Sequence, residues 1–265
     1  MNRAAVLGSP ISHSLSPTLH KRAYEILGIE AQYDAVEVPS GALSEFIENV
    51  NSTNSTNWLG FSLTMPLKEE VLTIADDIDP LAKRINSANT LIPISPRKWR
   101  ALTTDVSGFI WALTANDILE FRQVTIIGAG ATARAAAAAI DAPGRLIKVI
   151  NRNPNRVNAM KAAIENADVE FINWEEADLQ SDLVINTTPQ GVADSLPTGT
   201  GILFESLYHP WPTVLAEKWP GSVIDGLDLL VHQAIDQIAH MTGKSINRKD
   251  FAAELRKAGL LKLEK

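Results

Sequence analysis

The 265-residue sequence contains no cysteine, which excludes disulfide bonds, thiolate metal sites, iron–sulfur clusters and a cysteine nucleophile. It also lacks any run of about 18 apolar residues, so we expect no transmembrane helix and no membrane partner. A basic excess is missing too, because 24 Lys and Arg residues stand against 31 Asp and Glu residues, a net charge of −7. Proteins that bind nucleic acid usually carry a basic patch, and we therefore expect no nucleic-acid partner.

The rest of the composition is typical of a globular protein. Hydrophobic residues make up 45% of the chain and charged residues 21%, which excludes a chain that is disordered throughout. At about 150 residues per domain, the length predicts two domains or one large one. The opening segment MNRAAVLGSP has neither the apolar core nor the cleavage site of a secretion signal, so we expect a cytoplasmic protein. The five histidines show no metal-ligand spacing, and we expect no metal site.

Short β-like runs alternate with helical stretches in the first hundred residues. This alternation predicts a mixed sheet covered by helices. We expect strands at residues 4–7, 33–38 and 59–64, helices at 18–27 and 43–50, and a hairpin of 89–94 with 101–104 whose turn lies at 95–98.

The pattern becomes stricter from Val124 onward. Short apolar runs there are separated by helical or connecting segments, as in a parallel sheet buried on both faces. We expect strands at 124–127, 147–150, 169–172, 183–186, 202–205 and 223–224. A helix at 107–119 crosses the expected domain boundary near 105–122. An amphipathic helix follows Gly226, and the final helix is expected at 248–258, ended by Gly259.

A glycine-rich turn stands between the strand at 124–127 and an alanine-rich helix. It has the form G-x-G-x-x-A, in which the first glycine permits a tight turn and the second allows close approach of a pyrophosphate. The small last residue allows close packing of helix and strand, and the helix N-terminus attracts the anion. The pattern predicts dinucleotide binding, the alternative being an ordinary turn; its residues are Gly128, Ala129, Gly130, Ala131, Thr132 and Ala133.

The end of the next strand indicates which dinucleotide is bound. A site for NAD usually has an acidic residue here, which accepts a hydrogen bond from the ribose. This chain has Asn151 and Arg152 instead, with Arg156 four residues later. Arginine can bind a 2′-phosphate through two hydrogen bonds, so the sequence favours NADP over NAD. The alternative is a solvated basic turn.

Polar residues also stand at the ends of elements in the N-terminal half. Ser14 and Ser16 would point to the same side of an extended segment and could bind a carboxylate, or they could cap the following helix. Lys68 lies near a helix start, where the helix dipole disfavours a cation, which indicates a functional role. Asn89 and Asp105 lie similarly at element ends.

Taken in order along the chain, these elements resemble the motifs of the shikimate/quinate dehydrogenase family. The resemblance covers essentially the whole sequence. The matching segments are Ser14-Leu-Ser16-Pro-Thr-Leu-His20, Ser62-Leu-Thr64-Met-Pro66-Leu-Lys68, Asn89-Thr-Leu91, Thr103-Thr104-Asp105-Val106, Gly128–Ala133, Asn151-Arg152-Asn153 and Asp225-Gly226 through Gln233.

The resemblance implies an α/β fold of two domains with a cleft between them. Residues 1–105, completed by the C-terminal helices at about 240–265, would form a mixed-sheet substrate domain, and residues 106–239 a Rossmann-type NADP-binding domain. The implied activity is the NADP-dependent, reversible oxidoreduction of shikimate and 3-dehydroshikimate in aromatic amino-acid biosynthesis. The implied partner is that small substrate, and the implied assembly is a monomer or a homodimer.

The resemblance also implies residue roles. Lys68 and Asp105 would form the catalytic pair; the alternative for them is a salt bridge between the lobes. Ser14 and Ser16 would hold the substrate carboxylate. Ring hydroxyls would be bound by Ser62, Thr64, Asn89 and Gln233. Tyr208 would lie near the nicotinamide and the substrate, and Thr187 and Gly226 would line the cofactor site.

The chain departs from the family pattern at several positions. Ser62 and Thr103 stand where the family usually has asparagine, and Val106 and Asp228 stand where it has glycine. Ser62 is shorter and lacks the amide, so we expect it to hold a substrate hydroxyl more weakly or through water. Two alternatives follow: a quinate/shikimate dehydrogenase of broader specificity, or a non-catalytic regulatory protein that binds a dinucleotide. The presence of both Lys68 and Asp105 favours an enzyme.

Overall fold

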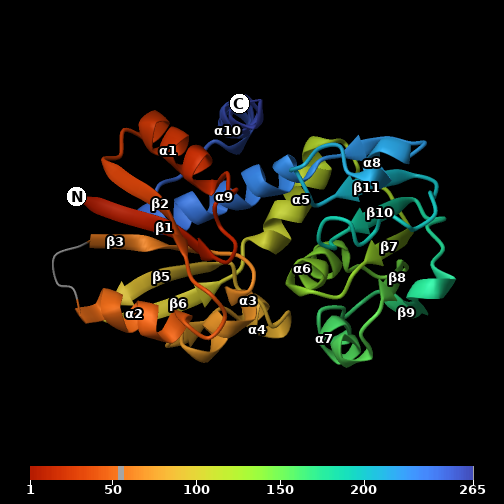
Figure 1. Ribbon diagram of the computed structural model, residues 1–265, viewed down its shortest axis with the longest axis horizontal. Helices are drawn as coiled ribbons and strands as arrows, with labels where there is room; N and C mark the ends of the chain where they lie inside the picture. Colours follow the sequence, from red (N-terminus) through yellow and green to blue (C-terminus); the bar gives the residue numbers. More distant parts are fainter. Residues whose placement is uncertain (53–56, 265) are drawn as a thin grey trace. The chain divides into compact units, whose positions relative to one another are not determined.

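The computed structural model describes residues 1–52 and 57–264. The chain forms two compact units: unit 1 comprises Met1–Thr104 and Val231–Lys265, and unit 2 comprises Asp105–Leu230. Each unit is built around a six-stranded sheet (Figure 1). The predicted α/β fold class, with a mixed sheet followed by a parallel one, is confirmed.

The sheet of unit 1 is mixed. Its strand order is β2-β1-β3-β5-β6-β4. Strand β1 runs parallel to β2 and β3, whereas β5 runs antiparallel to β3 and β6. The strands are β1 (Asn2–Gly8), β2 (Ala31–Glu37), β3 (Asn57–Leu63), β4 (Asp77–Ile78), β5 (Thr90–Ser95) and β6 (Lys98–Leu102).

Alternation along these strands divides their side chains between two faces. Leu7, Phe61 and Leu63 pack in one apolar core with Leu43 and other side chains of the helices on that side. Helices α2, α3 and α4 lie on this face, whereas α1 and α9 cover the other and α10 packs against α1 (Figure 1). The helices are α1 (Ser16–Leu27), α2 (Leu43–Ser52), α3 (Leu67–Glu70), α4 (Pro80–Arg84), α9 (Gly226–Thr242) and α10 (Arg248–Leu263), with a 3₁₀ turn at Val71–Thr73.

The sheet of unit 2 is entirely parallel, and its order is β12-β11-β10-β7-β8-β9. This is the order of a doubly wound dinucleotide-binding fold, which reverses between β7 and β10. The strands are β7 (Gln123–Ile127), β8 (Leu146–Asn151), β9 (Asp168–Asn173), β10 (Leu183–Asn186), β11 (Ile202–Glu205) and β12 (Val223–Ile224). The last three agree with the predicted ranges.

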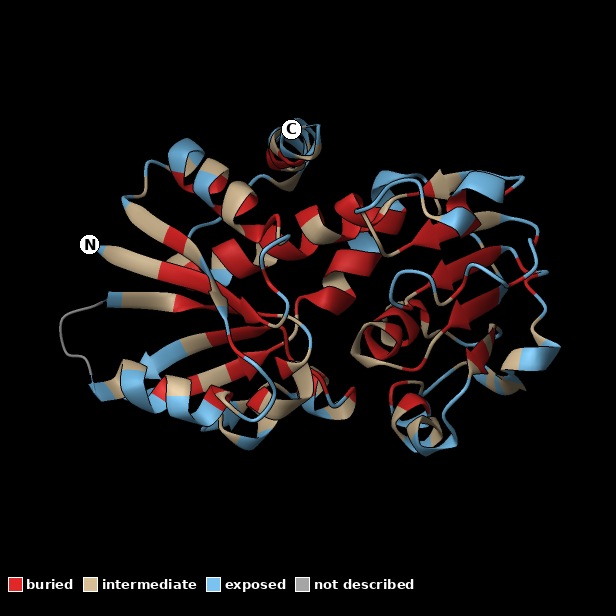
Figure 2. Ribbon diagram, in the orientation of Figure 1, coloured by how far each residue is buried: buried red, intermediate tan, exposed pale blue. Residues whose placement is uncertain are grey.

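Helices cover both faces of this second sheet. Phe109 of α5 packs on Phe204 of β11, whereas Leu215 of α8 belongs to the apolar core on the other face. The central strands are buried and the outer helical surfaces are exposed (Figure 2). The helices are α5 (Asp105–Ala115), α6 (Ala131–Ile140), α7 (Val157–Ala162) and α8 (Val214–Lys218), with 3₁₀ turns at Pro154–Arg156 and Trp174–Glu176.

Several predicted boundaries differ from the structure, and three of these differences have a clear physical cause. Helix α5 starts at Asp105 and ends at Ala115, because Asn116 bonds back to the carbonyl of Ala112 and Asp117 has a φ of 57°. The hairpin turn narrows to residues 96–97, since Lys98 already pairs with Ser95. Gly259 does not end α10 but is buried inside it, because packing of the helix overrides the weak helix propensity of glycine.

Two findings concern membranes and metals. Over residues 1–52 and 57–264, no helix is long and apolar enough to cross a bilayer. Within the same residues, no group of three or more His, Asp or Glu side chains is placed to hold a metal ion.

Candidate active site

Asn89 is the centre of a buried polar cluster in unit 1. It lies immediately before β5 and is 2% exposed. Its Oδ1 accepts hydrogen bonds from the backbone N–H of Thr104 (2.8 Å) and from Oγ1 of Thr90 (2.9 Å). Its Nδ2 donates to Oγ1 of Thr104 (2.9 Å) and to Oε1 of Gln233 in α9 (3.1 Å). Two of the predicted ring-hydroxyl binders, Asn89 and Gln233, are thus brought together from positions 144 residues apart.

Thr64 and Lys68 follow β3 at the same end of the sheet. The N–H of Thr64 donates to the carbonyl of Leu7 (2.9 Å), which ties it to the end of β1. A Cβ on Gly8 would come within 2.3 Å of the Thr64 methyl, so glycine is needed for this close approach. Lys68 is the second residue of the four-residue helix α3, and its carbonyl accepts from the N–H of Ala88 (2.8 Å). The backbone of Lys68 therefore lies beside the segment that carries Asn89.

The second member of the predicted catalytic pair, Asp105, is the first residue of α5. It directly follows Thr104, whose N–H bonds to Asn89, and it is 4% exposed. Lys68 belongs to unit 1 and Asp105 begins unit 2. Their pairing stays a prediction.

The geometry expected for Ser14 and Ser16 was wrong. The segment is a turn rather than extended chain, because the N–H of Ser14 donates to the carbonyl of Ile11 (3.1 Å) and Leu15 has helical dihedral angles. Ser14 is half-buried, and its Oγ accepts from the N–H of Ser16 at 3.3 Å. The two hydroxyl groups are thus related by a turn at the start of α1, not by strand alternation.

Ser62 occupies a buried position on the α9-facing side of β3. It is 3% exposed, accepts a hydrogen bond from the hydroxyl of Tyr33 (2.6 Å) and donates one to Oε1 of Gln237 (2.7 Å). Burial raises the pKa of Tyr33 well above its usual value, so this phenol stays protonated and can donate. The predicted substrate contact of Ser62 competes with these two bonds.

The glycine loop lies where the strand order of unit 2 reverses. Gly128 follows β7, and its N–H donates to the carbonyl of Ile150 in β8 (2.9 Å). It has a φ of 106°, and a Cβ there would come within 2.7 Å of Oγ1 of Thr187. Thr187 in turn donates to the carbonyl of Ile127 (2.8 Å), which joins the ends of β10 and β7. The carboxyl ends of the central strands thus converge on this loop, the usual position of a ligand in such sheets.

Helix α6 begins directly after this loop. Gly130 is the N-cap residue and contributes no side-chain cap, and nothing lies within 4 Å of the position that a Cβ would take there. Ala133 is fully buried against the sheet. Ala131 and Thr132 form the first, half-buried turn. The backbone is therefore open where a pyrophosphate would approach a helix N-terminus.

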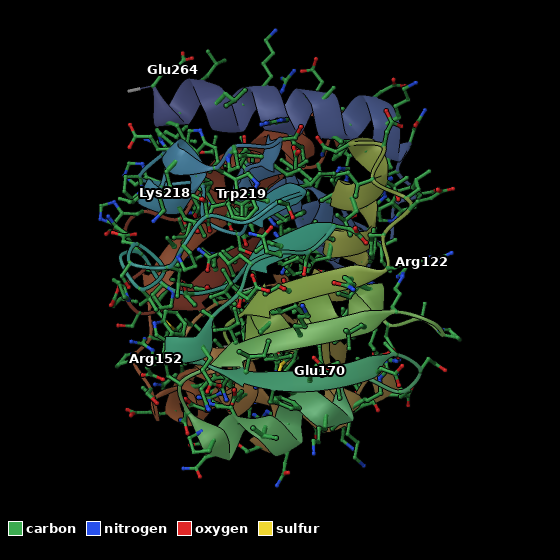
Figure 3. All side chains as sticks on the ribbon, turned by 90° about the vertical axis from the view of Figure 1, so that its right-hand side faces the viewer. Arg122, Arg152, Glu170, Lys218, Trp219 and Glu264 are labelled. Carbon is green, nitrogen blue, oxygen red and sulfur yellow. The ribbon has the colours of Figure 1, made fainter. Side chains whose placement is uncertain are left out.

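Arg152 follows β8 at the same edge of the sheet. Its guanidinium lies over the ring of Trp174, 4.8 Å from the ring centroid, a cation–π contact that orients the arginine. Figure 3 places Arg152 at the opposite end of the sheet from Arg122. Asn151 shapes the turn, since its Nδ2 donates to the carbonyl of Asn153 (2.6 Å) and its Oδ1 accepts from the N–H of that residue (3.0 Å). Arg156 is half-buried at the start of α7.

The segment after β11 carries Tyr208 and contacts Gly226. Tyr208 is half-buried, and the N–H of Gly226 donates to the carbonyl of the preceding residue, Leu207 (3.1 Å). A Cβ on Gly226 would come within 2.2 Å of the carbonyl oxygen of Ser206. Glycine is therefore required for the start of α9 to pass this loop.

Sequence reasoning missed Glu205, a fully buried carboxylate at the end of β11. It accepts hydrogen bonds from Nδ2 of Asn186 (2.8 Å), Oγ1 of Thr213 (2.9 Å) and the N–H of Leu207 (3.3 Å). Burial raises its pKa, although these donors favour the charged form. An acidic residue at the end of an apolar run was the available signal. Its bonds hold the loops that carry Thr187 and Tyr208.

Comparison with known proteins places this geometry in a family. The family model described as "Shikimate dehydrogenase substrate binding domain" matches residues 6–91, all within unit 1. A shikimate dehydrogenase (NADP(+)) of Prochlorococcus marinus subsp. pastoris is 31% identical over 263 residues, covering 90% of this chain and 90% of that protein. The chain belongs to the shikimate dehydrogenase family. Another such relative, from Thermus thermophilus, is 34% identical over 82% of each chain.

Solved structures of shikimate dehydrogenases have the same fold. A shikimate dehydrogenase of Thermus thermophilus in complex with shikimate matches with a TM-score of 0.85 and 31% identity, over 100% of both chains. A structure of that enzyme in complex with NADP(H) and shikimate matches with a TM-score of 0.82, over 97% of this chain and 100% of that one. The predicted resemblance and the predicted fold class, a substrate domain followed by a Rossmann-type domain, are confirmed.

Proposed function

We propose that this protein catalyses the NADP-dependent, reversible interconversion of shikimate and 3-dehydroshikimate. The observation that carries the proposal is the buried hydrogen bond between Asn89 and Gln233, which joins two amides predicted to bind ring hydroxyls next to the chain segments of Lys68 and Asp105. Both are amide side chains, which can donate to and accept from the hydroxyl groups of a polyol substrate. Shikimate dehydrogenases that use NADP(+) are relatives over 90% of this chain.

The glycine loop of unit 2 fits a dinucleotide, because the backbone at Gly130 is open and α6 has no side-chain cap. We propose that residues 128–133 bind the pyrophosphate and that Arg152, oriented by Trp174, binds the 2′-phosphate with Asn151 and Arg156. When bound, NADPH supplies the hydride. Thr187, Tyr208 and Gly226 line the nicotinamide end of this site.

The proton in our mechanism comes from Lys68. During reduction, hydride adds to the carbonyl carbon, the C=O π electrons move to oxygen, and the Lys68 ammonium donates a proton to that oxygen. The product is an alcohol, and the lysine is left neutral. In the oxidation direction the neutral amine accepts the proton. We propose that the carboxylate of Asp105 accepts a hydrogen bond from the Lys68 ammonium and so orients it toward the carbonyl oxygen.

The substrate is held by unit 1. We propose that Ser14 and Ser16 donate hydrogen bonds to its carboxylate, and that Thr64, Asn89 and Gln233 bind its ring hydroxyls. Hydrogen bonds to Thr90 and Thr104 fix the position of the Asn89 amide, and a substrate hydroxyl would replace its bond to Gln233. A group fixed in this way loses little entropy on binding. We propose that unit 1, which contains Gln233, is the substrate domain and that unit 2 is the cofactor domain. The limits expected from the sequence, residues 1–105 with about 240–265 and residues 106–239, instead put Gln233 in the cofactor domain.

One spectrophotometric assay tests the function. Purified protein is incubated with NADP and with shikimate or quinate in turn, and NADPH formation is followed. We expect turnover with shikimate. No turnover with either substrate would favour the non-catalytic regulatory alternative, and dominant turnover of quinate would favour the broader quinate/shikimate enzyme. We also propose that the protein is cytoplasmic and that it is a monomer or a homodimer. Light scattering of the purified protein tests the proposed assembly.

A further inference from the structure

The hydroxyl hydrogen of Ser62 is already engaged in a hydrogen bond within the protein. Gln237 is 1% exposed and donates from Nε2 to the backbone carbonyl of Asn89 (2.8 Å) and to Oγ1 of Thr90 (3.1 Å). A carbonyl oxygen can only accept, so Nε2 must face Asn89 and Oε1 must face Ser62. Ser62 therefore donates to Gln237 (2.7 Å), and Tyr33 must donate to Ser62 (2.6 Å).

The same series of hydrogen bonds, each with its donor on the same side, extends to the two proposed ring-hydroxyl binders, Asn89 and Gln233. Thr90 accepts from Gln237 and donates to Oδ1 of Asn89 (2.9 Å). Asn89 then donates through Nδ2 to Oε1 of Gln233 (3.1 Å). Each donor and acceptor has one orientation, and every member of the series is buried; the series is Tyr33–Ser62–Gln237–Thr90–Asn89–Gln233.

The aromatic start of the series is also fixed in place. The Tyr33 ring stacks on His20 of α1 with centroids 3.9 Å apart. Both rings are fully buried. Packing of the ring therefore fixes the position of the Tyr33 hydroxyl oxygen, 2.6 Å from Oγ of Ser62.

We infer that Gln237 is a positioning residue for substrate recognition and that Ser62 acts through it rather than on the substrate. The inference rests on the proposed function. Ser62 stands where the family usually has asparagine, and the amide missing from β3 is provided from α9 by Gln237. Gln237 bonds to the backbone carbonyl of Asn89 and the hydroxyl of Thr90, and so places the Asn89 and Gln233 amides, whose mutual hydrogen bond a ring hydroxyl would replace. Misplacement of a binding group by about 1 Å can lower the rate about 10²-fold.

A set of variants tests this positioning role. Gln237→Leu keeps the volume and removes every bond, and we expect kcat/KM for shikimate to fall at least about tenfold while KM for NADP stays within about twofold. Gln32→Leu is the matched control, because it also removes a glutamine hydrogen bond in unit 1, the one to Asp34, outside the series. We expect this control to keep wild-type kinetics.

A double-mutant cycle separates positioning from mere structural support. Ser62→Asn alone places a longer side chain against Gln237, and Gln237→Ala alone removes the bonds to Asn89, so we expect each to lower kcat/KM. In the double variant the alanine makes room for the asparagine amide, and we expect kcat/KM to recover to within about threefold of wild type. Losses that multiply would overturn the inference.

Substrate binding is also measured without turnover, as the rise in unfolding temperature with shikimate alone. This measurement detects substrate binding even in a variant that is folded but turns over slowly. We expect shikimate to raise the unfolding temperature of Gln237→Leu much less than that of the wild type. An unchanged rise and unchanged kinetics in Gln237→Leu, with an active wild type, would overturn the positioning role alone. A wild type that neither binds nor oxidises shikimate would overturn the proposed function and this inference together.

Discussion

Lys68 is positioned by a short helix and by a backbone hydrogen bond. It is the second residue of α3, and the N–H of Ala88 holds its carbonyl beside the Asn89 segment. We expect Lys68→Ala to lower kcat by about 10²–10⁴-fold, because a general acid–base group contributes that much, and to leave NADP binding nearly unchanged. Stopped-flow turnover and fluorescence titration of NADP measure the two effects.

The control for this variant is Lys83→Ala, which removes an exposed lysine of α4 in the same unit. We expect it to match the wild type. A Lys68→Ala variant that keeps most of its turnover number contradicts the catalytic role and favours a structural ion pair instead.

Arg152 is exposed, yet its guanidinium is held over Trp174 at the carboxyl end of β8. We expect Arg152→Ala to weaken NADPH binding about tenfold or more and to leave NADH binding nearly unchanged. A charge-assisted hydrogen bond is worth about 1.5–3 kcal/mol, and about 1.4 kcal/mol corresponds to a factor of ten. Paired titrations with both cofactors measure the difference.

Arg122→Ala is the matched control, since Arg122 is exposed at the opposite end of the same sheet (Figure 3). We expect no change in the affinity of either cofactor. If Arg152→Ala weakens NADPH and NADH equally, the arginine does not bind the 2′-phosphate.

The packing of α1 on β2 makes stability depend on pH. Burial lowers the pKa of His20 to about 3, because the ring is enclosed by Tyr24 and Tyr33, and an interaction with Gln237 offsets only part of this effect. In the unfolded chain the pKa is about 6.5. Protonation therefore favours the unfolded state. The contribution of neutral His20 is fully present above about pH 6.5 and is lost as pH falls toward 3.

This linkage predicts the behaviour of His20→Phe, which keeps an aromatic ring but cannot be protonated. We expect the free energy of unfolding of the wild type to fall relative to the variant by about 1.4 kcal/mol per pH unit between pH 6 and pH 4. Urea denaturation at several pH values measures it. His240→Phe, at an exposed position of α9, is the control and is expected to show no such divergence. Parallel curves for His20→Phe and wild type would show that folding does not lower the pKa of His20 and would contradict this prediction.

Substrate preference is a prediction for the whole molecule, because the proposed carboxylate site is in unit 1 and the proposed cofactor site is in unit 2. Quinate differs from shikimate by a saturated ring and a hydroxyl on the carbon that bears the carboxylate, so we expect discrimination near Ser14 and Ser16. The chain has serine at position 16 and no acidic residue at Asn151 or Arg152, features that favour an NADP-linked enzyme specific for shikimate. We expect kcat/KM for shikimate to exceed that for quinate at least about tenfold, or about 1.4 kcal/mol.

Side-by-side assays of both substrates at one pH check this preference. Equal or inverted values would assign the protein to the quinate/shikimate type of broader specificity. We infer that Ser62 and Gln237 act on the proposed ring-hydroxyl binders, so we expect their variants to change kcat/KM for both substrates in parallel.

The sequence by itself determined the elements that depend on neighbouring residues. Strands β10, β11 and β12 are bounded as their apolar runs predict, and the G-x-G-x-x-A loop lies between β7 and α6, because side-chain periodicity and glycine conformation act over a few residues. The sequence also predicted the family, since the family's motifs occur in order along the chain.

Only the tertiary structure decided which polar groups meet. Leu15 turns the chain between Ser14 and Ser16, the ring of Trp174 contacts Arg152, and Gln237 accepts the hydrogen bond of Ser62 from a position 175 residues away. No local pattern shows such a partner, because a buried hydroxyl bonds to whatever donor or acceptor the packed elements bring within about 3 Å. The role of Ser62 follows from that partner rather than from its place in the motif.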